Sequence, residues 1–205
     1  MLRLNVENVG RWFGRRMVFE NINFTLQPGE SLAVVGPNGS GKTTLIKIIT
    51  GLGLPTKGRV IFSDNGCKLD FDMYRPKLSL VAPYLALYDS LTAVENLRFL
   101  SRVNGQKVTN TEIETVLKKV GLEGRGGDMV EAYSTGMKQR LKYAAAIIKR
   151  PKVLLLDEPS ANLDEAGRGI IRGLIDLYRE NVILILATNE KEEYSLAGQL
   201  CQLGG

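Results

Sequence analysis

The segment from Gly36 to Thr43 has the sequence Gly-Pro-Asn-Gly-Ser-Gly-Lys-Thr and fits the phosphate-binding pattern G-x-x-x-x-G-K-[ST]. Glycines in such a loop allow a tight turn that directs backbone N–H groups at phosphate oxygens, and the following helix adds the positive end of its dipole. Lys42 would reach the outer phosphates of a nucleoside triphosphate, and the Thr43 hydroxyl would be one ligand of Mg²⁺. A glycine-rich turn that only caps a helix is the weaker interpretation. The expected nucleotide-binding residues are Gly36, Pro37, Asn38, Gly39, Ser40, Gly41, Lys42, Thr43 and Thr44.

Two neighbouring carboxylates, Asp157 and Glu158, follow the apolar run Val153–Leu156. A run of this length predicts a buried parallel strand, and open α/β sheets bind ligands at the carboxyl ends of such strands. Asp157 is suited to hold Mg²⁺ through water, and Glu158 could act as the general base for an attacking water. The alternative is that Asp157 and Glu158 only mark the point where the chain leaves the sheet. The phosphate-binding loop in the same chain favours a catalytic pair instead.

A third candidate is the start of a basic helix in Tyr133-Ser-Thr-Gly-Met-Lys-Gln-Arg140. Ser134 has the residue type of an N-cap, and free N–H groups beside a serine hydroxyl can bind an anion. Taken alone, an ordinary capped helix is the simpler interpretation.

These residues need a scaffold that brings strand ends and helix starts together. Ser31–Val35 before the loop predicts a buried strand, and Thr43–Thr50 after it predicts a helix. Alternating apolar and polar residues predict antiparallel strands at Arg3–Val9, Met17–Leu26, Gly58–Phe62 and Cys67–Phe71, the last two joined by an Asn-Gly turn.

The pattern becomes mostly helical between residues 84 and 149. Helices are expected at Thr92–Val103, Asn110–Val120 and Thr135–Lys149. Strand, helix and strand then follow at Val153–Leu156, Asp164–Tyr178 and Val182–Ala187. We therefore expect one α/β domain over residues 1–205, with a mostly parallel sheet, an antiparallel β subdomain and an inserted helical subdomain at about 84–149.

The composition is that of an ordinary globular domain, with 205 residues of which 44% are hydrophobic. The longest apolar runs have strand length, and the charged N-terminus does not resemble a signal peptide. Two cysteines, Cys67 and Cys201, in no metal-ligand spacing favour a reduced cytosolic interior. The net charge of +5 is compatible with nucleic acid, an anionic membrane surface or nucleotide as the partner, so it does not decide among them.

The motifs at Gly36–Thr43, Tyr133–Met137, Val153–Glu158 and Ser160–Asp164 occur in the order found in the nucleotide-binding domain of ATP-binding-cassette (ABC) proteins, and the chain resembles that domain over essentially its whole length. The resemblance implies ATP as the nucleotide. It also implies that Ser134 and Gly136 contact the γ-phosphate of ATP held by an opposite subunit, and that Asp164 lies at that dimer interface. Phe13 falls where the family stacks an aromatic ring on adenine, although packing within its own turn would also account for it.

Two positions depart from the family pattern. A glutamine that touches Mg²⁺ is replaced by Pro83, which has no side-chain donor or acceptor. A histidine after the strand Val182–Ala187 is replaced by Asn189, which could bind a γ-phosphate but cannot exchange a proton, and the chain contains no histidine. We expect ATP to bind and to be hydrolysed, with turnover slowed by these two replacements.

A single domain of this kind resembles the separate ATPase subunit of a bacterial transporter. The resemblance implies transmembrane transporter subunits and a second ATPase subunit, in a homodimer, as partners, with the chain cytoplasmic and peripheral on the inner face of the cell membrane. Residues 134–140 resemble exporter-type relatives, and Leu91–Phe99 resembles the haem-exporter ATPases of cytochrome c maturation. A non-transport ABC ATPase acting on nucleic acid or ribosomes is the alternative, disfavoured because such relatives usually carry two cassettes or a coiled-coil insertion. A regulatory ATP-binding module with slow turnover also remains open.

Overall fold

The computed structural model describes residues 1–204, which fold into two compact units. The first unit combines Met1–Leu80, Lys152–Glu158 and the residues from Arg179 onward. The second combines Val81–Pro151 with Pro159–Tyr178. The second unit covers the predicted helical insertion at 84–149 and also takes in residues 159–178.

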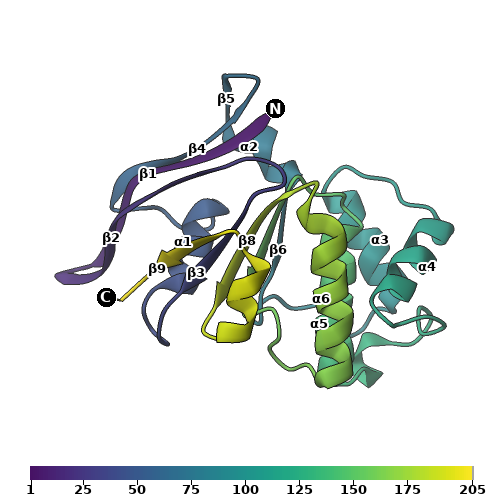
Figure 1. The fold of residues 1–205 in the computed structure, drawn as a ribbon. Coiled ribbons are helices and arrows are strands. Elements are labelled where there is room, and N and C mark those ends of the chain that lie inside the picture. Colours follow the sequence, from purple (N-terminus) through teal and green to yellow (C-terminus); the bar gives the residue numbers. More distant parts are fainter. Residues whose placement is uncertain (205) are drawn as a thin grey trace. The chain divides into compact units, whose positions relative to one another are not determined.

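Four antiparallel strands form one sheet of the first unit, in the order β2-β1-β4-β5 (Figure 1). They are β1 (Leu2–Phe13), β2 (Arg16–Leu26), β4 (Lys57–Asp64) and β5 (Cys67–Leu69). Asn65 and Gly66 form the turn between β4 and β5, with φ angles of 50° and 82°. The predicted antiparallel strands and their Asn-Gly turn are thereby confirmed.

The predicted strand Cys67–Phe71 is too long. β5 stops before Phe71, where a short helix, α2 (Phe71–Tyr74), begins. The Tyr74 ring stacks on Phe62 with centroids 4.2 Å apart, and the Phe71 ring meets Tyr74 edge-on at 5.4 Å. This aromatic packing accompanies the turn of the chain away from the sheet. It depends on Phe62 of β4, which lies outside the sequence Cys67–Phe71 from which the strand was predicted.

Five strands form a second sheet in the order β6-β7-β8-β3-β9. They are β6 (Leu78–Val81), β7 (Val153–Asp157), β8 (Ile183–Thr188), β3 (Ser31–Val35) and β9 (Gln199–Gln202). The pairs β7–β8, β8–β3 and β3–β9 are parallel, which confirms the predicted mostly parallel sheet. β3, β7 and β8 are buried almost throughout, which explains their uninterrupted apolar sequences. β6 and β9 were not predicted, because both strands are short.

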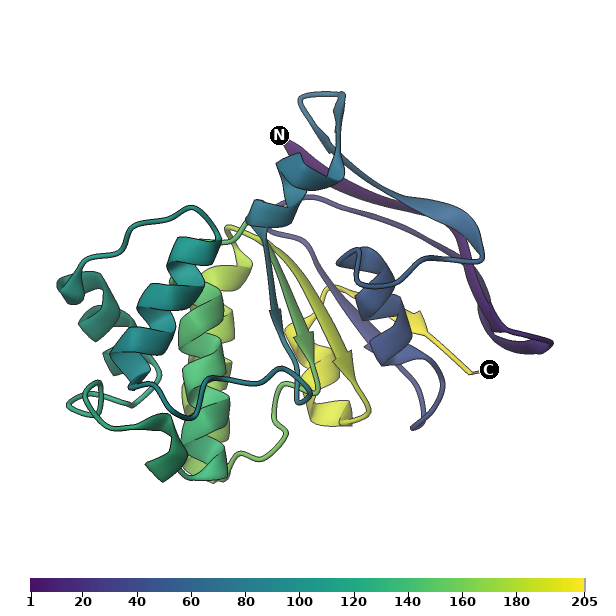
Figure 2. The same cartoon turned by 180° about the vertical axis from the view of Figure 1, so that it is seen from behind.

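Helix α1 (Lys42–Ile49) lies between the two sheets of the first unit in both views (Figures 1 and 2). Leu45, Ile46 and Ile49 are buried in one core cluster together with residues from both sheets. Because this core fixes α1 against the strands, the start of the helix is held at the carboxyl end of β3.

The second unit is helical. Its helices are α3 (Ala93–Val103), α4 (Asn110–Lys119), α5 (Thr135–Ile147) and α6 (Glu165–Arg179), which match the predicted helices within a few residues. Thr92 and Thr109 each begin a helix with a capping box, and α3 and α4 pack on α5 (Figure 2). Short 3₁₀ turns occur in the second unit at η2 (Val130–Ala132) and in the first unit at η1 (Arg75–Lys77) and η3 (Lys191–Leu196).

Candidate nucleotide site

The phosphate-binding loop leaves β3 and enters α1 at Lys42. Gly41 caps α1 with a φ of 102°, and a Cβ atom there would lie 2.6 Å from Cγ1 of Val18. At Gly36, where φ is 150°, a Cβ atom would lie 2.4 Å from the carbonyl oxygen of Leu203. Any other residue at these two positions would collide with its neighbours, so glycine is required for the path of the loop.

The Lys42 side chain is buried within the loop, with 6% of its surface exposed. Its ammonium group donates hydrogen bonds to the carbonyl oxygens of Gly36 at 2.7 Å and Pro37 at 3.1 Å. An ammonium carries three donors, so one remains for a phosphate oxygen. The first N–H groups of α1 also lack helical partners, and the dipole of the helix favours an anion at this end.

The Asp157 carboxylate lies at the end of β7 and is 2% exposed. Neither of its oxygens has a hydrogen-bonding partner within residues 1–204. Burial raises the pKa of Asp157, and the nearby Glu158 carboxylate raises it further, while the Thr43 hydroxyl and the charges of Lys42 and Lys47 oppose the shift. A buried, unpaired carboxylate is costly unless a cation compensates it. Asp157 and Thr43 therefore fit a divalent cation that retains part of its water shell.

Replacing Asp157 with asparagine is expected to stabilise the chain in the absence of Mg²⁺. Because its pKa is raised on folding, Asp157 destabilises the folded state increasingly as the pH rises above its ordinary value of 3.8, and fully above the raised pKa. Thermal unfolding in EDTA at pH 7 should show a melting temperature higher by on the order of a few degrees for Asp157→Asn. The gain should shrink towards pH 4.

The exposed residue Asp72 supplies the matched control, and Asp72→Asn should leave the melting temperature unchanged. A lower melting temperature for Asp157→Asn, at every pH tested, would show that the Asp157 carboxylate stabilises the empty site.

Glu158 follows Asp157 directly but has a different environment. Its φ is 50°, in the left-handed region, and its backbone N–H donates to the carbonyl oxygen of Ala187 at 2.8 Å. This conformation is uncommon for a residue other than glycine, and it turns the chain sharply after β7. Asp157 is thus buried while Glu158 is exposed, and the roles of the two residues stay predictions.

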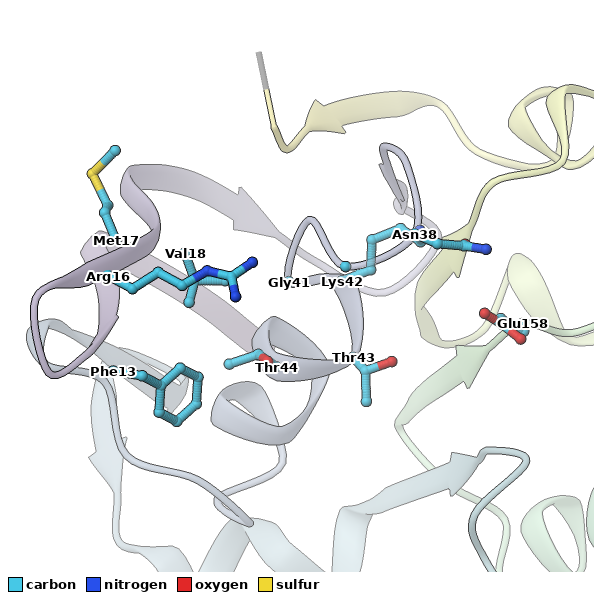
Figure 3. A pocket seen from close by; sticks show the side chains of 11 residues that line it. Phe13, Arg16, Met17, Val18, Asn38, Gly41, Lys42, Thr43, Thr44 and Glu158 are labelled. Atoms are coloured by element: carbon cyan, nitrogen blue, oxygen red, sulfur yellow. The ribbon is translucent and has the colours of Figure 1, made fainter.

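A pocket of about 780 Å³ lies beside these residues in the first unit. Phe13, Asn38, Lys42, Thr43 and Glu158 are among the residues that line it (Figure 3). The pocket therefore joins the aromatic ring of the β1–β2 turn to the phosphate-binding loop and the proposed base. Its volume suits a ligand of nucleotide size.

Phe13 is 55% exposed at the edge of this pocket. The guanidinium of Arg11 lies 4.4 Å from the centroid of its ring and also donates to the carbonyl oxygen of Leu54 at 2.8 Å. Arg11 thus covers one face of the ring and ties it to the neighbouring loop. The sequence had not indicated Arg11, and adenine stacking on Phe13 stays a prediction.

The family model described as ABC transporter matches residues 19–161. The chain belongs to this family. The linearmycin resistance ATP-binding protein LnrL of Bacillus subtilis is 32% identical over 93% of this chain, which spans only 62% of that relative. The cytochrome c biogenesis ATP-binding export protein CcmA of Vibrio parahaemolyticus is 31% identical over 94% of each chain, and a spermidine/putrescine import ATP-binding protein of Spiroplasma citri also matches. A solved structure of an ATP-binding subunit of an ABC transporter has a TM-score of 0.84 and 27% identity, over 98% of this chain and 85% of that one.

These matches confirm the predicted membership, including the likeness to export ATPases of cytochrome c biogenesis, and the predicted α/β fold. As an ABC ATP-binding subunit the chain binds nucleotide, and the family hydrolyses ATP. Within residues 1–204, the helices are too short or too polar for any of them to cross a membrane.

Asn189, which the sequence pattern predicts to stand in place of a family histidine, reaches the phosphate-binding loop. It follows β8, and its Nδ2 atom donates a hydrogen bond to Oδ1 of Asn38 at 3.2 Å. The two residues are 151 positions apart in the sequence, so the pairing of β3 with β8 brings them together. Asn189 can thus contact the loop but offers no ionisable proton.

Pro83, which the sequence pattern predicts to stand in place of a family glutamine, can form hydrogen bonds only through its backbone carbonyl. Its carbonyl oxygen accepts a hydrogen bond from Nζ of Lys142 at 2.9 Å, and the oxygen of Ala82 accepts one from the same atom at 3.3 Å. Lys142 lies on α5, and burial lowers its pKa. The loop is therefore tied to α5 by a lysine that the sequence had not indicated.

The remaining predicted residues, Ser134, Gly136 and Asp164, belong to the second unit. Ser134 caps α5, with its Oγ accepting from the N–H of Met137 at 3.2 Å, as the residue pattern predicts. Oδ1 of Asp164 accepts from the N–H of Gly167 at 2.8 Å at the start of α6, a capping role that the sequence had not indicated. The contacts of these residues with a second subunit stay predictions.

Proposed function

We propose that this chain is the ATP-hydrolysing subunit of an export-type ABC transporter, and that two copies close on two ATP molecules to drive transmembrane subunits. The observation that carries the proposal is the meeting of four groups in one unit. Lys42 lies inside the phosphate-binding loop, Thr43 and the unpaired Asp157 carboxylate adjoin it, and Glu158 lines the same pocket.

Each group has a distinct task in this proposal. Lys42 and the loop N–H groups hold the β- and γ-phosphates, and Glu158 accepts the proton of the attacking water. Thr43 and Asp157 would hold Mg²⁺, which would supply positive charge to offset that of the phosphates. Phe13 supplies an apolar face for adenine.

Removal of the metal tests this division of tasks. The purified chain should hydrolyse ATP with Mg²⁺ and lose all measurable turnover with excess EDTA. Without the cation, neither Asp157 nor Thr43 supplies positive charge to offset that of the phosphates. Phosphate release measured under both conditions decides the matter. Equal release in EDTA would remove the metal from the proposal.

The second half of each site comes from the other copy in this proposal. Ser134 and Gly136 of one chain would contact the γ-phosphate held by Lys42 of the other, and Asp164 would lie close to the interface. The exposed Ser134 hydroxyl and the positive end of α5 suit this contact with an anion.

Partners and location follow from the same proposal. The chain would dock beneath transmembrane subunits on the inner face of the cell membrane, and export is the direction suggested by the resistance and export relatives. Membrane fractionation tests this directly. Recovery of the chain with membranes only when its transmembrane partner is co-expressed is the expected result.

A regulatory module with slow turnover is the second candidate, favoured by Asn189 and Pro83. If the missing histidine limits the reaction, Asn189→His should raise turnover and introduce a pH inflection near 6.5, the ordinary pKa of imidazole. The wild-type chain has no histidine and can show no such ionisation. Steady-state turnover from pH 5.5 to 9 for both forms measures this effect. Equal rates for the two forms would show that Asn189 is not limiting.

A further inference from the structure

Arg16 lines the nucleotide pocket but belongs to none of the motifs described above. It is the first residue of β2, on the far side of the turn that carries Phe13. Its side chain extends over the pocket towards Gly41 and Lys42, whereas the neighbouring Met17 points away from them (Figure 3). The Arg16 guanidinium therefore lies in the pocket that the aromatic ring and the phosphate-binding loop also line.

The guanidinium of Arg16 has no hydrogen-bonding or ionic partner in the part of the chain that the structure describes. Arg11, in contrast, contacts the Phe13 ring and the carbonyl oxygen of Leu54, and Lys42 donates to the loop. Arg16 is thus a cation beside the pocket whose five N–H donors are not used by the protein.

We propose that Arg16 binds the α-phosphate of the nucleotide. The assignment rests on the proposed nucleotide site: with the base on Phe13 and the terminal phosphates in the loop, the α-phosphate falls between them, where the guanidinium lies. A guanidinium matches two phosphate oxygens with two parallel N–H donors, so the contact is charge-assisted and directional. Because ATP and ADP share the α-phosphate, Arg16 strengthens the binding of both.

The test compares nucleotide affinities of purified variants by titration calorimetry, with MgADP and the Mg²⁺ complex of a non-hydrolysable ATP analogue as probes. Arg16→Ala should weaken both probes by a similar factor of about ten. Arg15→Ala is the matched control, since Arg15 is the exposed neighbour with the same charge and does not line the pocket. It should change either affinity by less than about twofold.

Several outcomes would overturn the assignment. Loss of affinity for the analogue but not for MgADP would place the guanidinium on the γ-phosphate. Equal losses of affinity in Arg15→Ala and Arg16→Ala would show that the positive charge of the turn, and not a specific contact of Arg16, accounts for the effect. Lys42→Ala separates this inference from the proposed site. Weak binding by Lys42→Ala with normal binding by Arg16→Ala overturns the role of Arg16 alone, whereas normal binding by Lys42→Ala overturns the nucleotide site itself.

Discussion

Glu158→Gln should lower the rate of ATP hydrolysis by about 10²- to 10⁴-fold, the usual contribution of a general base. The amide preserves the shape of the side chain but cannot accept the proton of the attacking water. Glu158 lines the pocket without being buried, so the substitution should not disturb the fold. ATP affinity should be retained, because the phosphates are held by the loop and Lys42.

Turnover and affinity are measured on the same preparation, with Glu20→Gln as control. Glu20 is an exposed glutamate of β2 outside the pocket, so its replacement should leave both quantities unchanged. Unchanged hydrolysis by Glu158→Gln would remove this residue from the catalytic role. The reaction would then need another proton acceptor, such as the γ-phosphate itself.

Lys42→Ala should weaken the binding of MgATP by about tenfold or more, because a charge-assisted contact with phosphate is lost. The substitution also removes the hydrogen bonds that the ammonium donates to Gly36 and Pro37, so the loop loses an internal support. Both effects act on binding, in contrast to the effect of Glu158→Gln on the chemical step. Equilibrium titration with a fluorescent ATP analogue measures the difference.

Lys42→Met and Lys68→Ala supply the controls for this substitution. Methionine retains an apolar stem in the buried position and separates loss of charge from loss of packing. Lys68 is exposed on β5, and its replacement should leave affinity unchanged. Wild-type affinity in both Lys42 variants would show that phosphate is bound elsewhere.

The parts of the site that depend on neighbours in the sequence could be predicted. The turn at Gly36 and Gly41, the strand before it and the helix after it are encoded within about twenty residues, and the structure retains all of them. Asp157 and Glu158 also follow a run whose burial is evident from its composition. Local sequence indicates these features because Gly36 and Gly41 adopt positive φ angles, which glycine allows without steric cost.

The parts that depend on distant residues could not be predicted. The hydrogen bond from Asn189 to Asn38 arises only when β8 pairs with β3, and the hydrogen bond from Arg11 to Leu54 joins residues 43 positions apart. Nothing in the sequence pattern distinguishes Arg16 from Arg15, although only Arg16 lines the pocket. Side-chain direction at a turn follows from tertiary packing, which composition and spacing do not contain.

The proposal that two copies close on ATP is tested most directly by the mass of the Glu158→Gln chain in solution. We expect the mass of one chain without nucleotide and of two chains with MgATP, since ATP would remain bound between them. Ser134→Arg in the same chain should leave ATP binding intact and keep the mass at one chain, because a bulky cation would replace the hydroxyl at the γ-phosphate. Full occupancy by ATP at the mass of a single chain, or a dimer that Ser134→Arg does not disrupt, would contradict the account.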